Sequence, residues 1–334
     1  MSPICELTPD YILSKEEHLQ LREALSTVLA NPYRQYESFC YQIIELLRND
    51  KIPQNLIKSL TECSLKNKKE DPFIFVRNLP IDENVPVFDN ENPVISKYEL
   101  KKTFVGEGCL YLIGHLLNQV PIGYINVNGG DVFQDIYPQQ KLKDTQSQKA
   151  LGPIYFHKDL ANHFVRPDYV NMISMRSNNE NEIFTTFVKN IDVLSSFSEE
   201  EIEGFEKPNF YTPFDDLTTK AGSYNVGEAD HHPIISDGYD IRYFENRTVG
   251  LDDKSNQLVE KMKSRLHEMK KRVQMIDGDF IGVANNFSVH GKEVGNLTQP
   301  DLAWNRWTMK TVNVTSIEPH RKNMLSGSNY VVQG

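Results

Sequence analysis

Short runs of β-branched and aromatic residues, each followed by a turn signal, recur along this chain and constrain its fold more than any other feature. One run, Phe73–Arg77, is followed by Pro80, and another leads into the turn Asn128-Gly129-Gly130. Such runs predict strands. We expect strands at 73–77, 123–127, 132–137, 154–157, 171–176, 184–188, 240–244, 280–283 and 308–314. Many short strands separated by turns favour a β-sandwich or barrel.

Helices are expected at the N-terminus and between the later strands, where apolar residues recur at helical spacing. The segments are 14–64 with breaks at Asn31-Pro32 and Pro53, 98–119, and 252–273 with an apolar stripe that ends at Val273. Ser198 and Glu201 have the spacing of a capping box, which predicts a short helix there. The stretch 206–235 is rich in Pro and Gly, so we expect a lid or binding loop.

The charge balance excludes some classes of partner. The 334 residues carry 36 basic and 46 acidic side chains, a net charge of −10. Nucleic acid and anionic membranes require a basic face, so we expect neither as the main partner. The N-terminus has no basic segment before an apolar run, and no stretch approaches the ~18–20 apolar residues of a membrane span, so we expect a cytoplasmic protein. The sequence leaves a homo-oligomer open.

The tripeptide His157-Lys158-Asp159 narrows the chemistry. Residues i and i+2 of an extended segment share a face, so the imidazole and the carboxylate point to the same side. One more histidine, with His290 as the candidate, would complete the two-His, one-carboxylate set of non-heme Fe(II) oxygenases, which leaves coordination sites open. Alone the tripeptide is weak evidence, because a surface His beside a surface acid is common in a chain with nine histidines.

The order of motifs around this tripeptide resembles the clavaminate synthase and asparagine oxygenase branch of the Fe(II)/2-oxoglutarate-dependent oxygenases. The resemblance covers residues 121–314. Its motifs are Asn126–Gly130, Phe133–Pro138, Thr145–Lys149, His157–Asp159, Pro167–Tyr169, Met175-Arg176, Thr185–Val188, Gly278-Asp279, Asn286, His290-Gly291 and Asn305–Trp307. Each motif is short, but their order and spacing together point to this branch.

The resemblance implies a mainly β fold with helices. The core would be a double-stranded β-helix, or jelly roll, with an N-terminal helical layer and an inserted helix. We expect residues 1–334 to form a single oxygenase domain. Its parts would be a largely helical segment 1–120, a jelly-roll core 121–314 with the lid at about 206–235 and the helix at about 252–273, and a C-terminal tail 315–334.

The resemblance also implies Fe(II) as the metal, with 2-oxoglutarate and O2 as co-substrates and with succinate and CO2 as products. The catalytic iron ligands would be His157, Asp159 and His290. Arg306 would bind the distal carboxylate of 2-oxoglutarate, because a guanidinium grips a carboxylate through two hydrogen bonds. Thr185 would add a hydroxyl hydrogen bond, with the adjacent Thr186 as the alternative.

The chain departs from the branch at three positions. Asp159 stands where the branch more often has Glu and where related halogenases lack a carboxylate, so hydroxylation is favoured over chlorination. Lys292 and Lys310 stand where the branch usually has Arg. Lys310 would contact the α-carboxylate of the substrate, with charge but without the fork geometry of Arg. Gln134 would hold the α-amino group.

Acidic residues guide the expected substrate. Glu245, Asp240 or Asp237, or the lid acids Asp215 and Asp216, could pair with an ammonium or guanidinium. We therefore expect hydroxylation of an unactivated side-chain carbon of a free L-amino acid, with L-lysine first and L-arginine second. Alternatives are an asparagine or other polar amino acid hydroxylase, and a desaturase or cyclase of the same family. More distant are a zinc hydrolase, for which a base motif such as HExxH is missing, and a non-catalytic jelly-roll binding protein, which would not need the triad.

Overall fold

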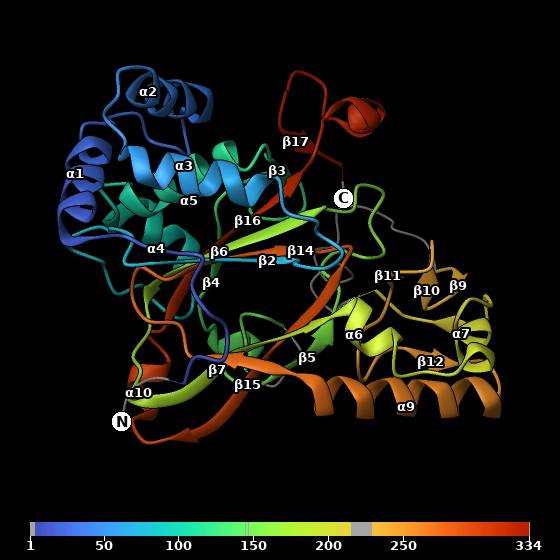
Figure 1. The fold of residues 1–334 in the computed structure, drawn as a ribbon. Coiled ribbons are helices and arrows are strands. Elements are labelled where there is room, and N and C mark those ends of the chain that lie inside the picture. Colours follow the sequence, from blue (N-terminus) through green and yellow to red (C-terminus); the bar gives the residue numbers. More distant parts are fainter. Residues whose placement is uncertain (1–3, 144, 146, 215–228, 334) are drawn as a thin grey trace.

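Two β-sheets form the centre of the computed structural model, which describes residues 4–143, 145, 147–214 and 229–333 (Figure 1). The larger sheet runs in the order β1 (Tyr11–Ile12), β2 (Phe73–Arg77), β14 (Phe280–Ala284), β6 (Tyr169–Arg176), β16 (Trp307–Val314), β3 (Val120–Tyr124) and β17 (Val331–Val332), and β4 (Gln134–Ile136) also pairs with β16. The smaller sheet runs in the order β13 (Lys271–Val273), β7 (Asn181–Lys189), β15 (Ser288–Leu297) and β5 (Ile154–His157).

The alternation of side chains along each strand builds the core between these sheets. On β6, Val170 and Met172 pack with Phe187 of β7 in one apolar cluster. Ile173 and Met175, at the intervening positions, belong to a second cluster with the N-terminal helices. This pattern follows from the period of two in a strand that is buried on both faces. The inward face of β16 therefore carries its even-numbered residues, and its odd-numbered residues face the helices.

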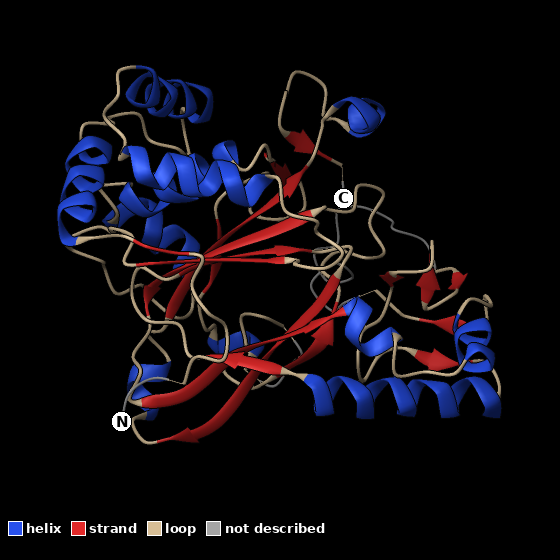
Figure 2. Cartoon of the chain, in the orientation of Figure 1, coloured by secondary structure: helices blue, strands red, loops and turns tan. Residues whose placement is uncertain are grey.

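The N-terminal helices cover the outer face of the larger sheet (Figure 2). They are α1 (Lys15–Ser26), α2 (Tyr36–Arg48), α3 (Gln54–Ser64), α4 (Pro93–Leu100) and α5 (Val105–Leu116). Ser14 begins α1 with a complete capping box to Glu17. Leu110 and Cys109 of α5 are fully buried against this sheet, so α5 forms the centre of the helical layer.

A second group of elements packs on the outer face of the smaller sheet. Its helices are α6 (Asn190–Leu194), α7 (Glu199–Phe205) and α9 (Asp253–Met269), and its short strands are β8 (Phe210–Tyr211), β9 (His231–His232), β10 (Ile235–Ser236), β11 (Asp240–Ile241) and β12 (Val249–Gly250). Leu258 and Met262 of α9 share an apolar cluster with Val188 and Val289 of the smaller sheet. The remaining elements are η1 (Gln140–Leu142), α10 (Pro300–Ala303) and η2 (Glu318–Asn323).

The fold class expected from the sequence is confirmed, with local corrections. The predicted capping box of Ser198 and Glu201 is complete at α7. The helix expected at 252–273 ends at Met269, because Lys271–Val273 pairs with β7 as strand β13. The strand expected at 240–244 covers only Asp240–Ile241.

The helical and tail segments also differ from expectation. The segment 1–120 contributes β1 and β2 to the larger sheet, and the tail 315–334 contributes β17. Part of the expected lid forms β8 and β9, and its residues 215–228 lie outside the described part of the chain. Within the described residues, every helix is too short or too polar to cross a membrane.

Candidate active site

Three side chains with metal-binding atoms converge on one point. One ligand atom from each of His157, Asp159 and His290 lies within 4.8 Å of the others. His157 ends β5, and His290 lies directly opposite in β15, with the two ring centroids 4.6 Å apart. All three side chains are largely buried. The antiparallel pairing thus brings together two histidines that are far apart in the sequence.

Hydrogen bonds orient the two imidazoles. Nδ1 of His157 lies 2.8 Å from the carbonyl oxygen of Tyr155, so it donates there and leaves Nε2 as the metal-binding atom. That Nε2 is 3.2 Å from Oδ1 of Asp159, and Nε2 of His290 is 3.9 Å from the same oxygen. Burial and the neighbouring His157 lower the pKa of His290 to about 3. His290 is therefore neutral, the form in which an imidazole binds a metal.

Asp159 lies beyond the strand, in a turn held by Asn285. The backbone N–H of Asp159 donates to Oδ1 of Asn285 at 3.0 Å, and Nδ2 of Asn285 donates to the carbonyl oxygens of Asp159 and Pro167 at 3.1 and 2.8 Å. Leu160 follows with a φ of 53°, which is unusual for a non-glycine residue. The extended geometry expected for all three residues of the tripeptide therefore ends at His157, and a turn completes the position of the carboxylate.

Lys310 pairs with the second oxygen of Asp159. Its Nζ lies 2.9 Å from Oδ2, and both groups are buried. Burial opposes ionisation of Asp159, but the Lys310 ammonium and the hydrogen bond from His157 hold the pKa of this carboxyl well below its usual range. Asp159 is therefore an anion, as a metal ligand must be.

A small cavity on one side of the triad holds the predicted co-substrate residues. Thr185, Lys292 and Arg306 line it together with His157, Asp159 and His290. Thr185 of β7 pairs in register with Lys292 of β15, and Thr186 is not part of the lining. The cavity therefore favours Thr185 over its neighbour. The register of β15 against β5 shifts between His290 and Lys292, a bulge of the kind often found beside functional sites.

Arg306 is a buried cation without a partner. Its side chain is 8% exposed, and no described residue accepts a hydrogen bond from its guanidinium or forms an ion pair with it. Burial lowers its pKa to about 10, so it remains charged near neutrality. Burial and Arg306 lower the pKa of Lys292 to about 7, and the Nζ of Lys292 donates to the carbonyl oxygen of Ala150 at 2.5 Å. An unpaired buried charge is costly unless a ligand neutralises it.

A larger cleft of about 820 Å³ also borders the triad, and its volume is within the usual range for ligand pockets. His157, Asp159 and Lys310 line both cavities. Gln134 of β4 pairs in register with Lys310 of β16, and both face this cleft. The Nε2 of Gln134 is buried without a partner among the described residues. The two residues predicted to hold the amino acid backbone of a substrate thus lie side by side.

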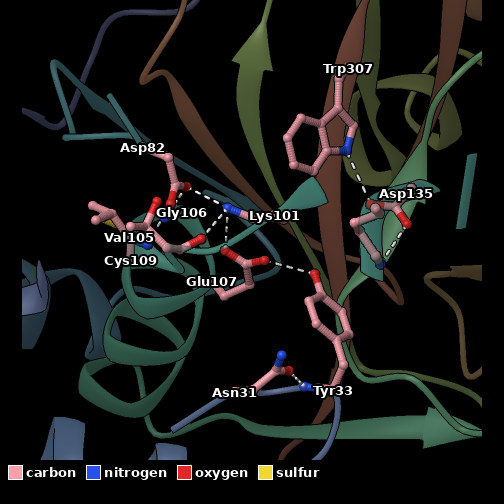
Figure 3. Close-up of polar contacts among 12 residues, drawn as sticks. Asn31, Tyr33, Asp82, Lys101, Val105, Gly106, Glu107, Cys109, Asp135 and Trp307 are labelled. Atoms are coloured by element: carbon pink, nitrogen blue, oxygen red, sulfur yellow. Dashed lines mark hydrogen bonds and ion pairs between the residues drawn. The ribbon is translucent and has the colours of Figure 1, made fainter. Parts of the chain in front are cut away.

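A buried polar network supports these strands from behind (Figure 3). The indole Nε1 of Trp307 donates to Oδ1 of Asp135 at 3.0 Å. In the same layer, Lys101 pairs with Asp82 at 2.6 Å and with Glu107 at 3.1 Å, and Tyr33 donates to Glu107 at 2.7 Å. Trp307 follows Arg306 and Asp135 follows Gln134, so the network and the site use opposite faces of the same strands.

Two residues predicted to contact the substrate are engaged elsewhere. The carboxylate of Glu245 accepts from Nε2 of His267 at 2.9 Å and from the backbone N–H of Phe156 at 3.3 Å, and Glu245 does not line either cavity. Asp240 pairs with Lys158 at 2.5 Å and also lies outside both linings, as does Asp237. Asp215 and Asp216 are outside the described residues. Glu245 and Asp240 therefore do not line the cleft, which differs from the substrate contact expected for them.

Two residues of the site were not predicted. Asn285, which holds the turn of Asp159, precedes the Asn286 of the resemblance by one position, and nothing in its spacing identifies it. Lys149 lines the large cleft, although the sequence motif Thr145–Lys149 gave it no role. Its position in that motif was the only signal available.

The chain is similar to known proteins of the branch that its sequence motifs resemble. The chain is 23% identical to clavaminate synthase 2 of Streptomyces clavuligerus over 299 residues, which are 87% of this chain and 86% of that protein. Asparagine oxygenase in complex with Fe(II), 2S,3S-3-hydroxyasparagine and succinate matches with a TM-score of 0.82, at 18% identity, over 97% of this chain and 99% of that one. The non-heme iron oxygenase OrfP with Fe, succinate and (3S)-hydroxy-L-Arg matches with a TM-score of 0.80, at 19% identity, over 97% and 100%.

These similarities extend over nearly the whole chain, although no protein-family model matches it. The structural matches establish the jelly-roll fold with its helical layer. The sequence match covers 87% of this chain. The chain is therefore similar in sequence to clavaminate synthase 2, and similar in fold to asparagine oxygenase and OrfP.

Proposed function

We propose that this protein is a 2-oxoglutarate-dependent dioxygenase that uses Fe(II) to hydroxylate an unactivated side-chain carbon of a free L-amino acid. The convergence of His157, Asp159 and His290 within 4.8 Å carries the proposal. Two imidazoles and one carboxylate leave coordination sites open for other ligands, as non-heme Fe(II) oxygenases require. The solved structures of asparagine oxygenase and OrfP, whose ligands include iron and a hydroxylated amino acid, support this assignment.

The donor set fits the metal in its protonation states. His157 has its Nδ1 occupied by a carbonyl oxygen and its Nε2 turned toward Asp159. His290 is neutral because burial lowers its pKa, and its Nδ1 is buried without a partner in the part of the chain that the structure describes. Asp159 is ionised. These residues need no proton rearrangement to accept a divalent cation.

The small cavity fits the co-substrate. A five-carbon diacid that reaches the metal through one end needs a cation for its far carboxylate. Arg306 lies in this cavity, buried and with no partner among the described residues, and a guanidinium can grip a carboxylate through two hydrogen bonds. Thr185 adds a hydroxyl from the facing sheet. Apolar residues of the lining, among them Ile154, Val170 and Met172, would keep water from the bound diacid.

The protein residues position the reactants for the oxidation. When bound, Fe(II) would supply the site at which O2 and 2-oxoglutarate react. One oxygen atom of O2 enters the C–H bond of the substrate and the other enters succinate, while CO2 leaves. Lys310 holds Asp159 ionised and in place, and Asn285 fixes the turn that carries it. Arg306 would fix the orientation of the diacid, so that its other end lies at the metal-binding side chains.

The large cleft would hold the amino acid. Gln134 and Lys310 lie on neighbouring strands at its inner end and offer an amide and an ammonium to the α-amino and α-carboxylate groups. The predicted preference for lysine or arginine rested on Glu245, Asp240 or Asp237 and on the lid acids Asp215 and Asp216. Glu245 and Asp240 have other partners, and the lid acids lie outside the described residues. Asparagine or another polar amino acid is an alternative within the same chemistry, as is desaturation or cyclisation.

The activity test is direct. Enzyme loaded with Fe(II) under anaerobic conditions is mixed with 2-oxoglutarate, O2 and each common L-amino acid, and succinate and product mass are measured. We expect succinate that depends on the amino acid, with a product one oxygen atom heavier. A product lighter by two hydrogens would instead assign a desaturase. If no amino acid raises succinate above the background rate, the free amino acid part of the proposal is wrong.

A further inference from the structure

The large cleft has a charge opposite to that of the whole chain. The net charge is −10, yet cationic side chains outnumber acidic ones in the described lining. The cations are Lys141, Lys149, Lys158, Arg242, Arg247 and Lys310, and the acids are Glu91 and Asp159. A cleft lined by one sign of charge attracts ligands of the other sign. The local field therefore favours an anionic ligand.

Few acids in this lining are left for a cationic substrate. Asp159 is one of the three metal-binding side chains and already pairs with Lys310. Glu91 is exposed to solvent. An ammonium or guanidinium entering the described cleft would thus meet several cations before it met a free carboxylate. Its burial without a carboxylate partner would be unfavourable.

Some of the cations already have partners, and their pairing identifies those that do not. Lys158 pairs with Asp240 at 2.5 Å, and Arg242 pairs with Asp230 at 2.6 Å. These two cations need no substrate carboxylate. Lys310 donates to Asp159 at 2.9 Å and has further N–H donors for an α-carboxylate. The guanidinium of Arg247 lies over the Phe244 ring, 3.5 Å from its centroid. Lys141 is exposed, which leaves it hydrated. Lys149 differs from all of these.

Lys149 is a partly buried cation without an acid among the described residues. No carboxylate oxygen of the described residues lies within the 4.0 Å of an ion pair from its Nζ. The acid with the largest influence on it, Asp135, is occupied by Lys97 at 2.7 Å. Burial lowers the pKa of Lys149, and Lys97 and Lys310 lower it further. An anion beside Lys149 would relieve both effects.

Unpartnered amide groups of the same lining add hydrogen-bond donors. The Nε2 of Gln134 and the Nδ2 of Asn128 are buried without a partner among the described residues, and both residues line the cleft. Buried donors are normally satisfied, so each marks a place for a ligand oxygen. The unpartnered Oδ1 of Asn126, by contrast, fits the ammonium of an amino acid.

We propose that the substrate is an amino acid with a carboxylate side chain, of the aspartate or glutamate class, and that Lys149 binds this carboxylate. Lys310 then holds the α-carboxylate, and the amide oxygens of Gln134 and Asn126 accept from the α-amino group. This inference rests on the proposed function and adds the substrate class to it. An acidic side chain replaces the basic one expected from the sequence, because Glu91, the acid of the described lining that lies outside the metal-binding triad, is exposed.

The first experiment compares matched substrates. The Fe(II) enzyme is given L-aspartate, L-glutamate, their amides L-asparagine and L-glutamine, and the bases L-lysine and L-arginine, and kcat/KM is measured from succinate release. The acids differ from their amides by little more than charge. We expect one acid to exceed its own amide by about 30-fold or more, the scale of a buried charge pair. Faster turnover of lysine, arginine or an amide would overturn the inference.

The second experiment tests Lys149. In Lys149→Met, kcat/KM for the acid should fall by about 30-fold or more, with little change for its amide. In Lys149→Glu, the acid should be rejected and the preference should move toward the amide or a base. Lys143→Met is the matched control, because Lys143 is exposed on the same segment and lines neither cavity. An unchanged kcat/KM for the acid in Lys149→Met would overturn the assignment of Lys149.

A binding measurement separates this inference from the function on which it rests. Calorimetry with 2-oxoglutarate is run on the Fe(II)-loaded wild-type enzyme and on each variant. Intact binding of 2-oxoglutarate, without turnover of either acid, overturns the substrate class and leaves the iron and co-substrate sites standing. Loss of 2-oxoglutarate binding in the wild-type enzyme overturns the proposed function itself. Unchanged binding in the Lys149 variants also shows that they fold.

Discussion

The indole Nε1 of Trp307 donates a hydrogen bond to Oδ1 of Asp135 at 3.0 Å, on the face of the sheet opposite the site (Figure 3). The other carboxylate oxygen of Asp135 accepts from Lys97 at 2.7 Å. Arg306 directly precedes β16, which begins at Trp307, and Gln134 precedes Asp135 on β4. The hydrogen bond therefore ties together the two strand segments that present Arg306 to one cavity and Gln134 to the other.

Replacing Trp307 by Phe should destabilise the protein by about 1–3 kcal/mol, because a buried acceptor on Asp135 loses its donor. Urea denaturation measures this change. The control is Trp304→Phe, since Trp304 is only partly buried and its indole has no hydrogen bond among the described contacts. The control should stay within about 0.5 kcal/mol of the wild type. Equal losses in the two variants would mean that the Asp135 bond contributes nothing specific.

Replacing Asn285 by Ala should weaken Fe(II) binding by about 10- to 100-fold, the usual effect of removing a group that orients a metal ligand. Asn285 forms three hydrogen bonds that fix the turn of Asp159 and touches no other ligand side chain. Anaerobic titration with Fe(II) gives the affinity. Asn296→Ala, at a position outside both cavities, is the control. Wild-type affinity in Asn285→Ala would rule out this positioning role.

Replacing Arg306 by Met should raise the Kd for 2-oxoglutarate by about 30-fold or more, because a buried carboxylate would lose its cation. Arg306→Lys should lie between this variant and the wild type, since it keeps the charge but not the paired hydrogen bonds. Calorimetry on the Fe(II)-loaded enzyme measures both. Arg265→Met, on the exposed side of α9, should bind normally. If Arg306→Met binds as tightly as the wild type, another residue holds the distal carboxylate.

Glu107 should make stability depend on pH. Burial, opposed by Lys101, raises its pKa from 4.5 to about 6. The folded state thus holds this proton more tightly than the unfolded state, so the stabilisation is present below about pH 4.5 and is lost as the pH rises through about 6. The loss amounts to about 2 kcal/mol at 1.36 kcal/mol per pKa unit.

The measurement is the free energy of unfolding of the wild type and of Glu107→Gln across this range. The difference between them isolates Glu107 from the other titrating groups. Relative to the wild type, Glu107→Gln should gain stability with rising pH between about 4.5 and 6. A difference that does not change with pH would mean that Glu107 titrates normally.

Local patterns predicted several strands and the metal-binding side chains, but not β15, the strand that carries His290. The run Phe73–Arg77 is β2 with the expected bounds, because β-branched and aromatic residues suit a strand in any sheet. His157 and His290 were chosen from motif order, and the register of β5 against β15 places them opposite each other. Thr185 could be separated from Thr186 only by the structure, since neighbouring strand residues point to opposite faces.

The failures came from contacts between distant segments. The apolar stripe that ends at Val273 suits a helix, yet pairing with β7 turns Lys271–Val273 into a strand. Glu245 and Asp240 could not be assigned from sequence, because their partners His267 and Lys158 are 22 and 82 residues away. An acidic residue that is close to the site in the sequence need not line the site in the structure. The same long-range packing leaves Lys149 in the cleft without an acidic partner in the described part of the chain.

The iron site is tested most directly by anaerobic Fe(II) titration followed by single-turnover formation of succinate, in the wild type and in His290→Ala. The account predicts one Fe(II) bound per wild-type chain, with succinate formed when 2-oxoglutarate, substrate and O2 are added. It predicts weakened Fe(II) binding and little or no succinate in His290→Ala, because only two of the three converging side chains remain. Fe(II) binding and succinate formation at wild-type levels in His290→Ala would contradict the central claim.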